Sequence, residues 1–174
     1  MEVKIPATAV DIYRMLPEGT RCEVIFNELS MSPSPSTEHQ AISSRINALF
    51  YLFLESNNQG VAFAAPIDVY FEELQSVVQS DLVVILNQNK SLIHSDGIYG
   101  TPDIIIEILS SNYQHDTIKK KALYEKAGVK EYFIIGQTDG MVTKYILNSA
   151  LQYDLIYTEK RKIESSLLNY IFTI

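Results

Sequence analysis

The sequence predicts an α/β or α+β fold in which a mixed β-sheet is flanked by helices, within a single domain over residues 1–174. Residues 82–86 (LVVIL) and 104–109 (IIIEIL) are too uniformly apolar to face water, which is typical of strands buried on both faces. Apolar residues between 38 and 56 and between 115 and 127 repeat at helical spacing. A chain of 174 residues is long enough to bury one core.

The composition restricts the possible functions. Apolar residues make up 47% of the chain and charged residues 20%, as in globular proteins. The formal net charge of −7 argues against non-specific coating of nucleic acid, which needs a basic surface. The lone Cys22 permits no internal disulfide. Because neither a signal peptide nor a membrane-spanning apolar run is evident, we expect a soluble cytoplasmic protein.

The first third of the chain predicts a helix, a hairpin and a longer helix. PATAVDIYRML reads as a short helix with Thr8 as N-cap and Asp11 completing an acidic capping box. RCEVIFNELSM alternates like a strand or hairpin arm, and the prolines of SMSPSPSTEHQ then interrupt regular structure. Ser36 or Thr37 is expected to cap the helix that follows. Its predicted core face consists of Ile42, Ile46, Leu49, Phe50 and Phe53.

The remainder predicts mainly strands around one helix. GVAFAAPIDVYF is expected to form a strand or a bent strand pair, and SVVQSDLVVIL and TPDIIIEIL one strand each. HDTIKKKALYEKAG is a helix that ends at Gly128. VKEYFIIG, MVTKYILN and LQYDLIYTE predict further strands, and KIESSLLNYIFTI a terminal strand or hairpin.

Glu107 interrupts an otherwise apolar strand. An ionised carboxylate there is costly unless it is paired or binds a cation, so Glu107 either faces a cleft or serves as a structural ion-pair partner. Asp81, at the head of LVVIL, could share a divalent cation with Glu107 if the two strands are adjacent. Asp103 is the poorer partner, because four residues along one strand separate side chains by about 13 Å.

Lys120 is distinguished from its neighbours by its helical face. Leu123, Tyr124 and Ala127 lie three, four and seven residues further on, so the Lys120 side chain is expected to point towards the sheet. A carboxylate pair with a lysine suits Mg²⁺-assisted hydrolysis of a phosphodiester. A structural ion pair is the alternative.

Several segments together resemble the Uma-two family of restriction endonucleases, within the PD-(D/E)XK nuclease superfamily. They are EVIFNELSMSPSPSTEHQ, APIDV, SDLVVI, TPDIIIEILS and DTIKKKALYEKAGVKEYFII, and the resemblance covers about residues 20–147. It implies a restriction-endonuclease-like fold. Asp81 matches the first acid of the superfamily motif and Glu107 the second, and the motif's lysine position is occupied by Leu109.

The resemblance also implies roles for residues outside that motif. In this family the lysine stands on the helix, and Lys120 fits its D-x-x-x-K-x-x-x-Y spacing between Asp116 and Tyr124. The main-chain carbonyl of Ile108 would be a further metal ligand. Glu23 and Glu28 match the family's early acids, and His39 its histidine. For Tyr124, packing remains the simpler interpretation.

The chain departs from the family pattern at three positions. Ser80 stands where proline is usual before Asp81, and Ser111 replaces another proline. Asn27 replaces the glycine before Glu28, and must therefore tolerate the turn geometry that glycine served.

The prediction is thus a Mg²⁺- or Mn²⁺-dependent endonuclease acting on DNA. Its catalytic residues would be Asp81, Glu107 and Lys120 together with Glu23 or His39, and its metal ligands Asp81, Glu107 and Ile108. A homodimer is expected by analogy with enzymes that cut both strands. The alternatives are a non-catalytic protein-interaction module of the same fold and a nuclease acting on RNA. The remaining lysines of this region would either form a phosphate-facing patch or keep the helix soluble; they are Lys119, Lys121, Lys126 and Lys130.

Overall fold

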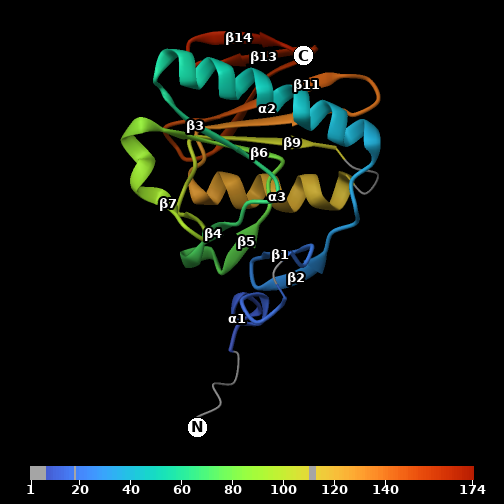
Figure 1. Cartoon of the computed structure of the whole chain (residues 1–174), viewed down its shortest axis with the longest axis vertical. Helices are drawn as coiled ribbons and strands as arrows, with labels where there is room; N and C mark the ends of the chain where they lie inside the picture. Colours follow the sequence, from blue (N-terminus) through green and yellow to red (C-terminus); the bar gives the residue numbers. More distant parts are fainter. Residues whose placement is uncertain (1–6, 18, 110–112) are drawn as a thin grey trace.

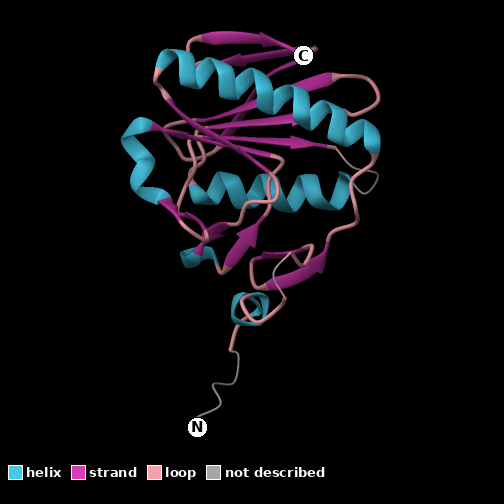
Figure 2. Cartoon of the chain, in the orientation of Figure 1, coloured by secondary structure: helices cyan, strands magenta, loops and turns pink. Residues whose placement is uncertain are grey.

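The computed structural model describes residues 7–17, 19–109 and 113–174, without the side chains of 113–116. Two six-stranded β-sheets and the helices between and around them stack in layers, and a third sheet is the two-stranded hairpin β13–β14 (Figures 1 and 2). Helix α2 (Thr37–Asn57) and the hairpin β13–β14 cover one face of the larger sheet. Helix α3 (Tyr113–Ala127) lies between the other face and the smaller sheet.

The larger sheet has the strand order β12-β11-β10-β9-β6-β3. Only β9 and β10 are parallel, and α3 connects them; the other neighbours are antiparallel. The strands are β3 (Gly60–Ala64), β6 (Leu82–Leu86), β9 (Ile104–Ile108), β10 (Glu131–Ile135), β11 (Met141–Leu147) and β12 (Tyr153–Lys160). Its central strands are buried on both faces, as their uninterrupted apolar runs predict.

The smaller sheet has the order β2-β1-β5-β4-β8-β7, and the short helix α1 (Ala9–Tyr13) packs against it. Its strands are β1 (Cys22–Ile25), β2 (Glu28–Met31), β4 (Val69–Phe71), β5 (Ser76–Val78), β7 (Ile93–His94) and β8 (Gly97–Tyr99). Two 3₁₀ segments, η1 (Glu72–Leu74) and η2 (Asn87–Leu92), join these elements, and β13 (Lys162–Ser165) pairs with β14 (Tyr170–Thr173).

The helix caps follow the predicted residues. Thr8 caps α1 within a complete capping box, and the Ser36 hydroxyl accepts from the His39 amide at the start of α2. Gly128 follows α3 with φ +87°, a conformation open to glycine at little cost. In the predicted core face of α2, Ile46 and Phe50 are buried and the other three side chains pack against the same core.

One predicted strand is divided in the structure, and one segment forms the strand pair that was among its predicted alternatives. The expectation of one strand over SVVQSDLVVIL was wrong, because β5 belongs to the smaller sheet and β6 to the larger. The chain passes between sheets at Gln79, whose amide donates to the Glu23 carboxylate (2.8 Å). GVAFAAPIDVYF is likewise a strand pair, β3 and β4, split between the sheets. Residues 87–100, for which no element was predicted, form η2, β7 and β8.

The pairing of β6 with β9 brings the two predicted acids together. Leu82 pairs with Ile106, and the two strands are antiparallel. Asp81, one residue before Leu82, therefore lies opposite Glu107, one residue after Ile106. Val83 and Ile105, the preceding pair, belong to the core cluster that includes α3. Because side chains alternate along a strand, Glu107 lies on this same face, towards α3.

Among the described residues, no helix has the length and apolar character that crossing a membrane requires.

Candidate active site

Asp81 and Glu107 meet Lys120 at the end of the larger sheet. The Lys120 ammonium lies 3.3 Å from both carboxylate oxygens of Glu107. Asp81 Oδ2 accepts a hydrogen bond from the Ile108 amide (2.7 Å), which ties the start of β6 to the end of β9. Lys120 therefore points towards the sheet, as its helical face predicts, and Glu107 both pairs with a lysine and faces a pocket.

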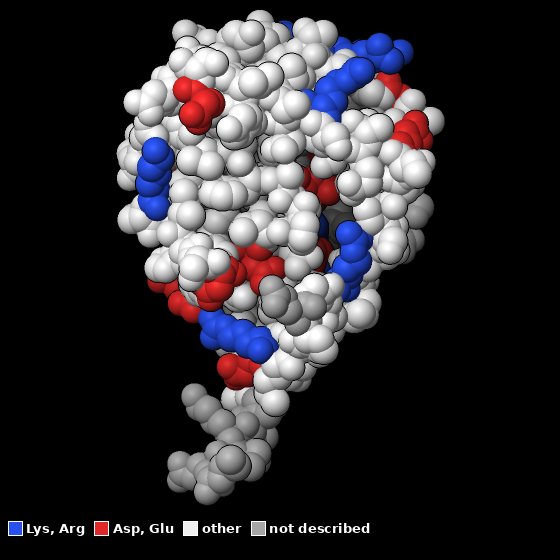
Figure 3. Space-filling model, viewed as in Figure 1, with Lys and Arg blue, Asp and Glu red and all other residues white. Residues whose placement is uncertain are grey.

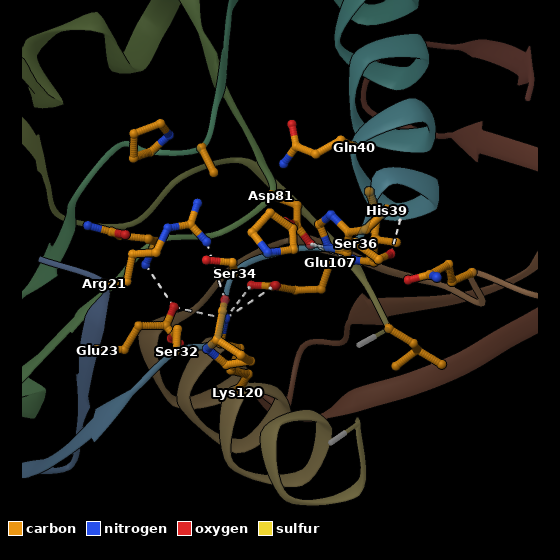
Figure 4. A pocket seen from close by; sticks show the side chains of 18 of the residues that line it. Arg21, Glu23, Ser32, Ser34, Ser36, His39, Gln40, Asp81, Glu107 and Lys120 are labelled. Atoms are coloured by element: carbon orange, nitrogen blue, oxygen red, sulfur yellow. Dashed lines mark hydrogen bonds and ion pairs between the residues drawn. The ribbon is translucent and has the colours of Figure 1, made fainter. Parts of the chain in front are cut away.

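Glu23 joins this cluster from the other sheet. Its Oε1 lies 2.9 Å from the Lys120 ammonium and accepts the Gln79 amide hydrogen bond. One lysine therefore lies between a carboxylate of β1 and a carboxylate of β9 (Figure 4). Each of the three side chains belongs to a residue less than a tenth exposed.

His39, in the first turn of α2, contacts Asp81, the first acid of the motif. Its Nε2 lies 3.3 Å from Asp81 Oδ2, and the hydrogen bond to Asp81 raises the pKa of His39 above its ordinary value, against the effect of burial. Its Nδ1 is buried and has no hydrogen-bond partner in the described part of the chain. The Ser36 cap begins α2 at this point, and so sets the position of the imidazole.

Tyr124 does more than pack. Its hydroxyl donates a short hydrogen bond to Glu107 Oε1 (2.5 Å) and lies 2.9 Å from the Ser80 hydroxyl. Burial, followed by the charge of Glu107, raises the pKa of Tyr124 well above its ordinary value, so the hydroxyl keeps its proton. Ser80, one of the departures from the family pattern, therefore extends a chain of hydrogen bonds that runs through Tyr124 to Glu107.

A pocket of about 980 Å³ is lined by the side chains of the cluster, namely Glu23, His39, Asp81, Glu107 and Lys120, whereas Tyr124 and Ser80 lie behind this lining. Figure 3 shows the surface hollowed here, with acidic and basic side chains next to one another in the hollow. Arg21 and residues 30–36 form further parts of its lining, and Figure 4 shows Arg21, Ser32 and Ser34 on the side of Glu23. Sequence reasoning missed Arg21, although its place two residues before Glu23 on an alternating strand was an available signal.

Other acids singled out in the sequence lie elsewhere. Asp103 is at the opposite end of β9, where it accepts hydrogen bonds from Asn89 and the Leu86 amide and pairs with Lys130 (2.9 Å). Glu28 is exposed on β2, pairs with Lys119 and does not line the pocket. The Asp116 side chain and Ser111 lie outside what the structure describes.

The turn before Glu28 explains how Asn27 is accommodated. Asn27 has φ +64° and Phe26 φ +50°, so both loop residues of the β1–β2 hairpin are left-handed. Asparagine tolerates this region better than most residues, and its Oδ1 also accepts the Ala9 amide. The loss of the family's glycine therefore leaves the hairpin intact.

The remaining lysines are not arranged as one phosphate-facing patch. Lys121 lies over the Tyr145 ring and Lys126 over the Phe26 ring, at 4.2 and 4.8 Å from the centroids. Lys119 and Lys130 are held in the ion pairs with Glu28 and Asp103. Each has its own intramolecular partner, and of these four none lines the pocket.

The cluster has more carboxylates than cations. Burial raises the pKa of Glu107 to about 7; Lys120 opposes this shift, and the charges of Asp81 and Glu23 add to it. Burial by itself lowers the pKa of Lys120, but Glu107 and Glu23 outweigh it and raise that pKa above the ordinary value. With three acids around one lysine, the pocket favours an added proton or an added cation.

The donor set fits one kind of metal ion. Carboxylate and main-chain oxygens are ligands that Mg²⁺ and Mn²⁺ accept, and Mg²⁺ commonly keeps several waters. Within the described residues, no group of three or more His, Cys, Asp or Glu side chains is arranged for metal binding. Asp81, Glu107 and the Ile108 carbonyl are the oxygen donors of the pocket that could hold such an ion.

Comparison with solved structures identifies the class of fold. The chain superposes with a TM-score of 0.71 on a crystal structure described as "a putative nuclease belonging to DUF820" from Anabaena variabilis ATCC 29413. The two share 21% identity over 87% of this chain and 84% of the other. The predicted mixed α+β, nuclease-like fold is thereby confirmed.

The family follows from the sequence itself. Residues 9–170 match the Uma2 family, described as "Putative restriction endonuclease". The match covers most of the chain, which therefore belongs to the Uma2 family, and the family resemblance stated from the motifs is confirmed. No match was found among curated proteins.

Proposed function

We propose that this protein is a metal-dependent endonuclease that hydrolyses phosphodiester bonds, with DNA as its substrate. The observation that carries the proposal is the Lys120 ammonium held between Glu23 and Glu107, in a pocket that Asp81 also lines. A purely structural ion pair would need one carboxylate, whereas Lys120 contacts two buried carboxylates and Asp81 lines the same pocket. Burying this much negative charge beside one lysine is costly unless a cation is bound.

Asp81 and Glu107, with the Ile108 carbonyl, would hold Mg²⁺ or Mn²⁺. Such an ion supplies charge stabilisation at a phosphate oxygen and lowers the pKa of a bound water. The role of Lys120 is to orient the attacking water and neutralise charge that develops on the phosphate. Glu23 keeps Lys120 charged and aimed into the pocket, and His39 does the same for the Asp81 carboxylate through the Nε2 contact.

Three lysines in succession provide a matched test in a plasmid-nicking assay. Lys120→Ala is expected to abolish cleavage in Mg²⁺ or Mn²⁺ while Mn²⁺ binding persists, because the ammonium acts on the nucleophile. Lys119→Ala and Lys121→Ala remove the same charge from the same helix, and should reduce activity slightly at most, since their side chains engage Glu28 and Tyr145. Asp81→Asn and Glu107→Gln should lose both Mn²⁺ binding and cleavage.

Specific outcomes would contradict the proposal. Equal losses at all three lysines would indicate a general phosphate-binding surface. Cleavage of RNA but not of DNA would keep the chemistry and change the substrate. A wild-type chain that neither binds Mn²⁺ nor cleaves any nucleic acid would favour an interaction module of the same fold. Circular dichroism of Lys120→Ala checks that lost activity does not reflect unfolding.

We also propose a homodimer. All the candidate site residues come from one chain, so pairing is needed only to present two sites to two strands. A surface that supports pairing is β12, the terminal strand of the larger sheet, where Leu155 and Ile156 are exposed. Sedimentation velocity should give a dimer that Ile156→Lys converts to a monomer with an unchanged melting temperature. A wild-type monomer at all concentrations would contradict this proposal.

A further inference from the structure

One wall of the pocket is a single stretch of chain, residues 30–36, all of which belong to its lining. Strand β2 ends at Met31, and Pro33 and Pro35, which have no N–H to donate, prevent it from continuing as a paired edge. The hydroxyls of Ser30, Ser32 and Ser34 form no hydrogen bond to any other described residue. The wall therefore presents free hydroxyl groups at alternate positions along an extended segment.

Arg21 stands beside this wall. The Ser32 amide donates to the Arg21 carbonyl (2.9 Å), and Arg21 Nη1 donates to the Pro33 carbonyl (3.2 Å). These contacts hold the guanidinium at the pocket and leave most of its N–H donors available. Within the described part of the chain no carboxylate lies within ion-pair distance of Arg21, whereas Lys120, the other basic side chain of the lining, has two.

Arg21 is an exposed arginine that lines a pocket with three carboxylates, and it forms no ion pair with any of them. The chain has a net charge of −7, so acidic side chains are abundant. Lys119 and Lys130 each form an ion pair with one of them. Guanidinium and hydroxyl donors are the groups that proteins direct at phosphate oxygens. Arg21 and the serine wall together thus provide an anion-binding surface that runs into the candidate active site.

The depth of the acids restricts what can reach them. Glu23, Glu107 and Lys120 belong to residues less than a tenth exposed, and the hollow that contains them holds only about 980 Å³. An intact duplex is stiff, with a persistence length of about 150 base pairs, so it cannot bend one backbone into such a hollow cheaply. A single strand bends freely at each nucleotide and can enter.

We propose that the pocket takes one unpaired strand of nucleic acid, and that Arg21 and the hydroxyls of Ser32 and Ser34 bind the phosphate next to the one that is cleaved. This inference rests on the proposed function and names its substrate form and a binding residue. In a homodimer, each subunit would take one strand of a locally opened duplex.

The test measures binding without turnover. The probe is a fluorescein-labelled single-stranded DNA of about a dozen nucleotides, within the range of about 4–16 nucleotides that single-strand-binding domains of another fold cover. The same sequence is also prepared as a blunt duplex. Fluorescence anisotropy in Ca²⁺ should give at least tenfold tighter binding of the single strand. Arg21→Ala should weaken that binding roughly tenfold, as expected for loss of a charge-assisted phosphate contact. It should also reduce the slope of log K against log salt by about 0.7.

Arg45→Ala is the matched control, because Arg45 is an exposed arginine of α2 that does not line the pocket. Arg45→Ala should bind the single strand like the wild type. The affinity of Arg21→Lys should lie between those of the wild type and Arg21→Ala, because lysine keeps the charge but lacks the planar guanidinium group. The Ser32→Ala, Ser34→Ala double variant should weaken binding less than Arg21→Ala. Ser36 is left intact because it caps α2.

The failure of this inference can be distinguished from failure of the proposed function. If the duplex binds as tightly as the single strand, or Arg21→Ala binds like Arg45→Ala, the inference is overturned even when the wild type cleaves DNA. Absence of any DNA binding at low salt overturns it as well. Conversely, single-strand binding that depends on Arg21, in a protein that binds no Mn²⁺ and cleaves nothing, would support the inference and overturn the proposed catalysis.

Discussion

At the scale of single residues, Glu107 has an environment that its place in the sequence only partly indicates. The carboxylate receives a hydrogen bond from Tyr124 and pairs with Lys120, yet Asp81 and Glu23 add negative charge around it. The net effect is a pKa of about 7, against an ordinary value of 4.5. A group that gains a proton so readily in the folded state makes stability depend on pH.

We expect the metal-free protein to lose stability as the pH rises. The folded chain holds the Glu107 proton more tightly than the unfolded chain, so this stabilisation is fully present below about pH 4.5 and is lost as the pH passes about 7. The effect should be on the order of 1–3 kcal/mol. Glu107→Gln should remove this part of the pH dependence in urea melts with EDTA.

A second titrating group requires its own control. The pKa of His39 is also raised, so His39 likewise stabilises the fold at low pH and loses that contribution as the pH rises. His39→Gln should therefore retain the part of the pH dependence that Glu107→Gln removes. Identical pH profiles for the wild type and Glu107→Gln would show that Glu107 titrates normally.

At the scale of elements, a second buried ion pair secures the C-terminal hairpin. Lys144 of β11 lies 3.3 Å from Glu131 of β10 and donates to the Glu164 carbonyl (2.6 Å) and the Ser166 hydroxyl. Glu131 in turn accepts from the Ser165 hydroxyl and the Ser166 amide (both 2.7 Å). Two strands of the larger sheet thus hold the β13–β14 hairpin through a fully buried charge pair.

Lys144→Met is expected to destabilise the protein by about 3–5 kcal/mol, because it leaves the Glu131 charge buried without its partner. Lys162→Met is the control, since Lys162 forms ion pairs with Glu159 and Glu164 at the surface, where such pairs contribute little. Urea unfolding measures both variants. Mn²⁺ binding by folded Lys144→Met should equal that of the wild type, because this pair does not line the pocket. An equally small effect for both variants would contradict the assigned role.

At the scale of the whole molecule, the excess of acidic side chains disfavours contact with nucleic acid over an extended surface. The chain carries 14 basic and 21 acidic side chains, and the described lysines of α3 are engaged with partners of their own. Contacts with phosphate should therefore be few and confined to the pocket, where Arg21 and Lys120 are the basic side chains of the lining.

The expected consequence is weak binding with a shallow dependence on salt. With about two phosphate contacts, the slope of log K against log salt for single-stranded DNA should be near −1.4, at about −0.7 per contact. Cleavage should be strongest at low salt with Mg²⁺ or Mn²⁺. Anisotropy between about 25 and 200 mM salt measures the slope, for which extended duplex binders reach about −10. A steep slope would indicate a larger basic surface than the pocket provides.

Much of the fold could be predicted because its signals are local. The apolar runs of β6 and β9 indicate burial on both faces, Ser36 and Gly128 mark the ends of helices, and Glu107 is conspicuous because a charge inside an apolar strand needs a partner. The orientation of Lys120 towards the sheet also follows from spacing along one helix. Each of these depends on residues within a few positions of one another.

The tertiary structure decided the rest, because it depends on which distant segments pair. Residues 76–86 read as one strand, but the pairing of β5 with β1 and of β6 with β9 divides them between two sheets. That division brings Glu23 to Lys120 from the second sheet and places Arg21 and the serine wall beside the acids. The sequence by itself determined the acids, the lysine and the elements that carry them. The contact of Glu23 with Lys120, the Tyr124 hydrogen bond and the pocket arise only when chain segments far apart in sequence come together.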